Sequence, residues 1–156
     1  MKKKILSLLP LIFMLLWQLA CAKDDVGRQI EAKLDKAATN LMENKDIPQS
    51  WQLIVEVSQM LKVHPEYNDG EVAEGIADVL TTLLMKPWKY ANPYLTRKNS
   101  MEFDHFVLDH INEIYTVQAL KTAKKNITNG CNQEKFTICK QLITKINDEI
   151  ALRAKQ

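Results

Sequence analysis

The sequence predicts an all-α fold, a single compact bundle of five to six helices that follows a secretion signal. Apolar residues recur at helical spacing over most of residues 23–156, no stretch shows the strict alternation of a surface strand, and the breaks rich in Pro, Asn and Gly are short. The 134 residues that remain of the 156 after a signal of 22 suit one domain. We therefore expect a secretion signal over residues 1–22 and one helical periplasmic domain over residues 23–156.

The signal prediction rests on the order of residue types in MKKKILSLLPLIFMLLWQLACA. Three lysines form a basic start, Ile5 to Trp17 form an apolar core, and Ala20-Cys21-Ala22 supplies the small residues of a cleavage site. The apolar run is shorter than the roughly 20 residues that a membrane-spanning helix needs. The sequence therefore predicts export by a bacterium.

Two processing routes remain open at the end of the signal. Cleavage after Ala22 would release a soluble periplasmic protein. Alternatively, Leu19-Ala20-Cys21 resembles the end of a bacterial lipobox, which predicts a lipid on Cys21 and an outer-membrane lipoprotein facing the periplasm. Gln18 stands where an aliphatic residue is usual in that motif.

Removal of the signal changes the charge of the chain. It takes three of the 21 Lys and Arg residues and none of the 19 Asp and Glu residues, so 18 bases face 19 acids and the formal net charge becomes −1. A nearly neutral chain without a basic stripe argues against nucleic acid as a partner.

The two cysteines beyond the signal, Cys131 and Cys139, predict a disulfide because exported proteins fold in an oxidising compartment. The competing zinc site would need further ligands, and no CxxC or HxxxH accompanies them. Eight helical steps would separate their Cα atoms by about 12 Å, whereas a disulfide needs roughly 7 Å or less. The segment between them must therefore fold back as a loop, and the last helix must begin near Glu134 or later.

Three helices are expected in the first half of the domain. The first is Val26–Met42, and residues 43–50 form the turn that ends it. An antiparallel helix pair follows over Trp51–Leu84, joined at residues 64–69. Its first helix is apolar over more than half of its circumference, which predicts partners on two sides and a place at the centre of the fold.

Local signals place the ends of this pair. Asp69 is a candidate N-cap for the second helix, which should stop before Pro87. The links after Lys62 and Lys86 suggest a repeated helix hairpin of a HEAT-like kind.

The second half of the domain carries three further helical patterns. Asn99 or Ser100 caps a helix over residues 101–115, Thr116 caps a helix over Val117–Ile127, and the last helix carries Phe136, Ile143, Ile146 and Ile150. The apolar stripe of residues 101–115 consists of Phe103, Phe106, Val107, His110, Ile111 and Ile114. We expect His110 to be a core histidine with a hydrogen-bond partner and a perturbed pKa.

Two surfaces are candidates for contact with a partner. Glu71, Glu74 and Asp78 share one helix face and could dock a basic partner, although a solvated face is the equal alternative. Trp88, Tyr90 and Tyr94 lie in the segment KPWKYANPYLTRK, which is either a binding surface or a connector whose rings cover helix ends.

No motif of catalysis, cofactor binding or metal binding stands out. Neither phosphate-binding glycines nor a GxSxG or SxxK nucleophile occurs. His105 and Asp109, with Glu113 as the only obvious third ligand, come nearest to a metal site, and a solvated helix face explains them better. We therefore expect no catalytic residue, no cofactor and no metal.

One segment carries a family resemblance. Gly70–Leu80, GEVAEGIADVL, resembles a short segment of the periplasmic immunity proteins of the type VI secretion amidase class, over eleven of the 156 residues. The resemblance implies a small exported helical protein with disulfides that binds a toxin, and no functional residue is carried over.

Together these features predict a non-enzymatic periplasmic binding protein. Its partner is expected to be another protein, with an inhibitor or immunity protein against a toxin or envelope enzyme as the leading function. The alternative is a structural or accessory envelope lipoprotein acylated at Cys21.

Overall fold

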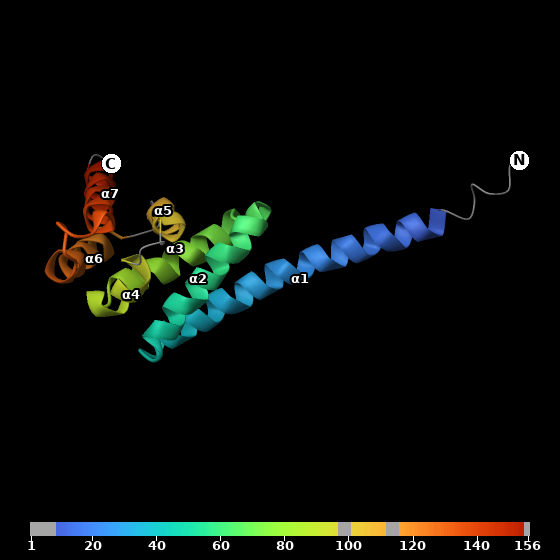
Figure 1. The fold of residues 1–156 in the computed structure, drawn as a ribbon, viewed down its shortest axis with the longest axis horizontal. Coiled ribbons are helices and arrows are strands. Elements are labelled where there is room, and N and C mark those ends of the chain that lie inside the picture. The colour runs from blue at the N-terminus through green and yellow to red at the C-terminus, as the bar shows by residue number, and fades with distance from the viewer. Residues whose placement is uncertain (1–8, 97–100, 112–115, 155–156) are drawn as a thin grey trace, which may run out of the picture.

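The computed structural model describes residues 9–96, 101–111 and 116–154, with side chains described from Asp25 onward. Every regular element in these ranges is a helix, so the prediction of an all-α fold is confirmed (Figure 1). The α-helices are α1 (Leu9–Met42), α2 (Ile47–Val63), α3 (Gly70–Leu84), α4 (Asn92–Leu95), α5 (Met101–Asp109), α6 (Val117–Gly130) and α7 (Thr137–Arg153). Two 3₁₀ turns, η1 (Pro65–Tyr67) and η2 (Trp88–Tyr90), lie in the links.

The first helix is longer than predicted. We expected it to begin at Val26, but α1 begins at Leu9 and runs without a break to Met42. Pro10 lies in its first turn, where the missing N–H costs no helical hydrogen bond, and no later proline interrupts it. Figure 1 shows α1 running alongside α2 and continuing well beyond the other helices toward the N-terminus.

The turn between α1 and α2 is shorter than residues 43–50. Asn44 and Asp46 take positive φ values of 53° and 44°, which reverse the chain within a few residues. Helix α2 then begins at Ile47 with Pro48 in its first turn, a position that suits proline. Asn, Asp and Pro in the sequence ENKDIPQS favour a turn. Proline is also common in the first turn of a helix, which is the position of Pro48 in α2.

Helix α2 lies at the centre of the core, as its wide apolar circumference indicated. Trp51, Ile54 and Val57 have no exposed surface, and α2 contacts α1, α3 and α5. The buried hydroxyl of Ser50 donates a hydrogen bond to the carbonyl of Ala37 on α1 at 3.2 Å. Its small side chain lets the two helices approach closely.

Helix α3 ends at Leu84, before Pro87 as predicted, and Asp69 takes the N-cap position without a side-chain hydrogen bond to the helix. Beyond α3 the chain passes through η2 and α4, and α6 packs back against α3. The amide of Asn126 on α6 donates to the carbonyl of Lys86 at 3.2 Å, which ties α6 to the end of α3.

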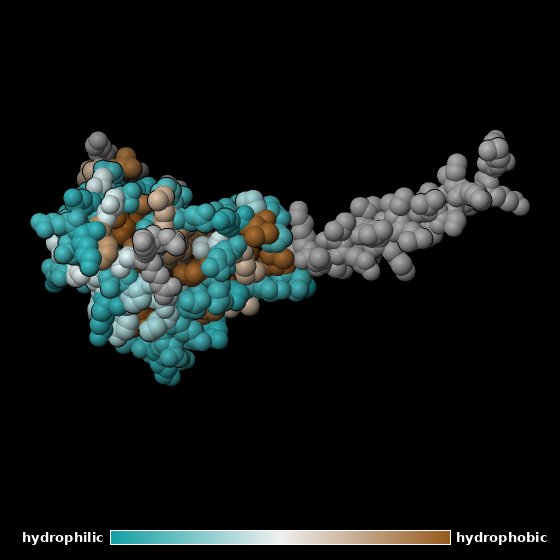
Figure 2. Space-filling model, in the orientation of Figure 1, coloured by the Kyte–Doolittle hydropathy of each residue, from teal (hydrophilic) through white to brown (hydrophobic). Residues whose placement is uncertain are grey.

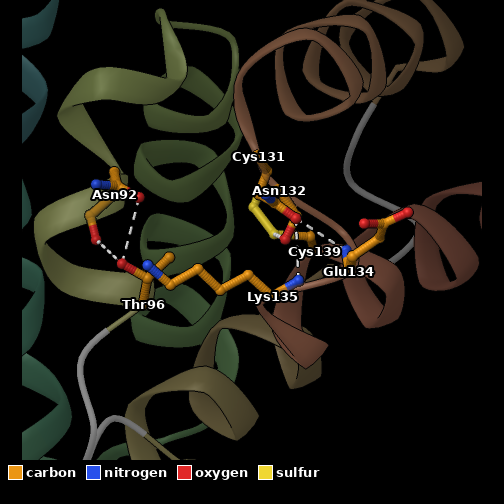
Figure 3. Close-up of a disulfide and its surroundings, with 7 residues drawn as sticks. All are labelled: Asn92, Thr96, Cys131, Asn132, Glu134, Lys135 and Cys139. Atoms are coloured by element: carbon orange, nitrogen blue, oxygen red, sulfur yellow. Dashed lines mark hydrogen bonds between the residues drawn. A yellow bond between two sulfur atoms is a disulfide. The ribbon is translucent and has the colours of Figure 1, made fainter.

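The predicted disulfide between Cys131 and Cys139 is confirmed, with Cα atoms 5.9 Å apart. Helix α6 ends at Gly130 and α7 begins at Thr137, later than Glu134 as required. Figure 3 shows the loop between them, where the side-chain oxygen of Asn132 accepts the backbone N–H groups of Glu134 and Lys135, each at 3.0 Å.

Several sequence predictions fall outside the described residues. These are the caps at Asn99 and Ser100 and residues 112–115 of the helix predicted over residues 101–115, including Glu113 and Ile114. Within the described residues this helix is shorter than predicted, because α5 ends at Asp109, and His110 and Ile111 lie beyond its end. Thr116 does cap α6, since its hydroxyl oxygen accepts the N–H of Ala119 at 3.1 Å. Among the helices that the structure describes, none has an apolar stretch of the length that crossing a membrane requires.

Candidate binding groove

Five side-chain rings form a continuous chain of contacts across α4, α2 and α5, which we call the aromatic row. Tyr94 stacks on Trp51 with ring centroids 5.7 Å apart, and Trp51 meets the edge of Phe103 at 6.4 Å. Phe103 stacks on Phe106 at 6.1 Å, and Phe106 lies 4.4 Å from His110. The row therefore links the core to the surface through three separate helices.

The members of the row come from α2, α4, α5 and the residue that directly follows α5. Trp51 lies in the first half of α2 with no exposed surface, and the hydroxyl of Tyr94 donates to the carbonyl of Pro48 at 2.8 Å. Phe103 and Phe106 stand three residues apart on α5, so they share one helix face. Tyr94, Phe103 and Phe106 are only partly buried, whereas Trp51 is fully buried beneath them.

A groove of about 710 Å³ lies between α2 and α5 over this row. Tyr94, Phe103 and Phe106 contribute its aromatic surface. Its exposed polar residues, which we call the groove rim, are Gln59, Lys62, Asn68, Glu102, His105 and Asp109. Figure 2 shows that apolar areas are small and scattered over an otherwise hydrophilic surface in this view.

The groove rim carries one cation and two carboxylates. Lys62 on α2 and Glu102 on α5 form an ion pair at 2.7 Å that bridges the two helices. Asp109 forms no ion pair with any residue that the structure describes. The pairing of Lys62 with Glu102 therefore leaves the rim with the net negative charge of Asp109.

His110 closes the inner end of the aromatic row and is only 5% exposed. Its Nδ1 lies 2.7 Å from the carbonyl of Phe106, and its Nε2 lies 3.0 Å from the side-chain oxygen of Asn68. Burial lowers the pKa of the imidazole, while the Phe106 carbonyl and the Asp109 charge act in the opposite direction. The expected core histidine, with a partner and a shifted pKa, is confirmed.

The lowered pKa makes the contribution of His110 to stability depend on pH. Well above pH 6.5, about the pKa of histidine in an unfolded chain, the imidazole is neutral in both the folded and the unfolded chain, so His110 makes its full contribution to the free energy of unfolding. As the pH falls below about 6.5, the unfolded chain takes up a proton before the folded chain does, and the free energy of unfolding decreases. We expect His110→Ala to lower the free energy of unfolding by on the order of 1–3 kcal/mol at pH 7.5, through lost packing and hydrogen bonds. The difference from the native chain should narrow at pH 5.

Urea unfolding of both chains at the two pH values checks this expectation. A stability difference that stays constant from pH 7.5 to pH 5 would show that burial does not alter the titration of His110. If His110→Ala leaves the free energy of unfolding unchanged at pH 7.5, His110 does not stabilise the core.

The structure separates the three aromatic candidates predicted from the sequence. Trp88 is 5% exposed and packs against α6 so closely that a Cβ at Gly130 would overlap it. Tyr90 is partly buried, with Lys89 Nζ 5.0 Å above its ring. Tyr94 lines the groove. The segment therefore behaves as a packed connector at Trp88 and contributes to the candidate site at Tyr94.

The acidic candidates Glu71, Glu74 and Asp78 are all exposed on α3. None of the cations described in the structure forms an ion pair with them. They do not line the groove, so this acidic stripe is a second and separate surface.

Sequence reasoning missed the site that Phe103 and Phe106 make with Tyr94. It assigned both phenylalanines to an apolar stripe in the core. It considered His105 and Asp109 only as metal ligands or as part of a solvated helix face. The available signal was two bulky rings three residues apart beside a polar helix face. The described residues contain no cluster of three side chains able to hold a metal ion.

Comparisons of the chain with protein-family models, with curated proteins and with solved structures find no match.

Proposed function

We propose that the chain is an exported periplasmic binding protein that inhibits a toxin or an envelope enzyme by docking it in the groove between α2 and α5. The observation that carries this proposal is the aromatic row, because it leaves Tyr94, Phe103 and Phe106 partly exposed in a groove with a polar rim. Rigid aromatic anchors surrounded by polar residues are typical of the energetic centre of protein interfaces.

The order of residue types at the N-terminus, with a basic start, an apolar core and Ala20-Cys21-Ala22, supports removal of residues 1–22. Ile30, Leu34 and Leu41 of α1 are buried in the core and lie beyond this cleavage site. Lipidation at Cys21 is the alternative, and it would hold the same body close to a membrane as an envelope lipoprotein.

We further propose that residues 23–156 form a single bundle. Contacts between α1 and α2, α1 and α3, and α3 and α6 support it, because they link both halves of the chain. The pair α2 and α3, joined through η1, is the candidate for a HEAT-like hairpin. In this arrangement the acidic stripe at Glu71, Glu74 and Asp78 would steer a basic partner toward the protein before docking.

The test is whether capture of a partner depends on the groove. The full chain is expressed in an exporting host and used to capture proteins from envelope extracts of its source cells. Gln59→Trp obstructs the groove and Asp109→Lys reverses the charge of its rim; both side chains are exposed, so the fold should tolerate the changes. Asp148→Lys makes the same charge change on an exposed position of α7.

We expect both groove variants to lose at least about tenfold of the partner that the native chain and Asp148→Lys retain, because one keeps the partner from the aromatic anchors and the other reverses the charge that the partner meets. Thermal unfolding of each variant confirms that the fold is intact. Equal capture by all four chains would remove the groove from the proposed function.

A further inference from the structure

We infer that the groove recognises an arginine side chain flanked by apolar residues on the partner, an inference that rests on the proposed function. The charge of the groove rim favours a positively charged group on the partner. Lys62 is already neutralised by Glu102 at 2.7 Å, whereas the exposed carboxylate of Asp109 forms no ion pair within the described chain. An incoming cation would pair with Asp109, and an incoming anion would face an uncompensated negative charge.

The aromatic surface selects the kind of cation. Phe103 and Phe106 stack with their planes only 16° apart, so the groove offers near-parallel rings on one helix. A cation close to such rings gains from their electron-rich faces. Asp109 lies three residues beyond Phe106, one turn along α5, so a single side chain can contact a ring and the carboxylate together.

Arginine fits this combination better than lysine. Its guanidinium is planar and weakly hydrated, stacks on rings and can pair with one carboxylate through two N–H donors, whereas the lysine ammonium is a compact and strongly hydrated point charge. The remaining lining includes Val55 and Leu61 on α2, which suits aliphatic or aromatic neighbours on the partner segment.

A selection from a random peptide library on the purified full chain tests this inference. Peptides are counted as groove binders when Gln59→Trp abolishes their binding. We expect groove binders to be enriched in arginine beside apolar residues. Synthetic copies of the best peptide, with that arginine replaced by lysine, citrulline or glutamate, are then titrated against the native chain and against Asp109→Asn.

We expect citrulline and Asp109→Asn each to weaken binding by about five- to tenfold, glutamate to weaken it further, and lysine to bind between arginine and citrulline. Asp148→Asn, an equivalent change on α7, should leave binding unchanged. Groove binders without arginine, or equal binding of the arginine and citrulline peptides, would overturn the inference while leaving the groove as a docking site. A selection without any groove binder would count against both the inference and the proposed function.

Discussion

Replacement of Trp51 with alanine is expected to lower the free energy of unfolding by about 3–5 kcal/mol, the largest stability effect of any single change considered. Trp51 has no exposed surface, lies in the first half of α2 and contacts Tyr94 and Phe103 through its ring. Its loss would leave a cavity between α2, α4 and α5 and would remove the support beneath the groove.

Trp51→Phe is the matched control. The indole Nε1 of Trp51 has no hydrogen-bond partner among the described residues, so phenylalanine would remove ring volume without breaking a hydrogen bond. We expect it to cost less than half as much as Trp51→Ala. Urea unfolding followed by circular dichroism measures both changes. Circular dichroism is used in place of indole fluorescence because both variants remove the indole of Trp51. A cost below about 1 kcal/mol for Trp51→Ala would mean that α2 is not the centre of the core.

Loss of the disulfide is expected to lower the free energy of unfolding by about 2–3 kcal/mol, the second large effect. The bond closes a loop with a sequence separation of eight, so the entropy that it removes from the unfolded chain is modest. The double change Cys131→Ser and Cys139→Ser removes the bond, and it also places a hydroxyl at position 139, where the cysteine has no exposed surface. We therefore expect the double variant to lose slightly more stability than the reduced native chain.

Reductant supplies the control for this comparison. It should destabilise the native chain and leave the double variant unchanged. Thiol counting on the oxidised protein should find neither Cys131 nor Cys139 free. A native chain that unfolds at the same urea concentration with and without reductant would show that the loop between α6 and α7 holds its shape without the bond.

The helical fold could be predicted because each helix has a periodic apolar face, and the disulfide could be predicted because cysteine geometry limits how the chain runs between residues 131 and 139. The boundaries of α1 and α2 were less accurate. The start of α1 was expected at Val26 because residues 1–22 were assigned to the secretion signal. The start of α2 was expected too late because Pro48 is read equally well as a break or as a residue of a first helical turn.

The groove could not be predicted from the sequence because it depends on how far α5 lies from α2. Phe103 and Phe106 have the same helical spacing whether they are fully buried or left partly open to solvent. Trp88 and Tyr94 look alike in the sequence but differ in their surroundings in the structure. They belong to one aromatic segment, yet Trp88 packs on α6 and Tyr94 reaches the groove.

Site-specific photo-crosslinking in exporting source cells tests the central claim most directly, because it reports what touches the groove in place. A short photoreactive side chain is introduced at Gln59 or His105 on the groove rim, and at the exposed Asp148 on α7 as the reference position. A partner in the groove predicts the same covalent adduct from Gln59 and His105 and none from Asp148. Adducts from Asp148 alone, or no adduct from either groove position, would contradict the groove as the site of partner binding.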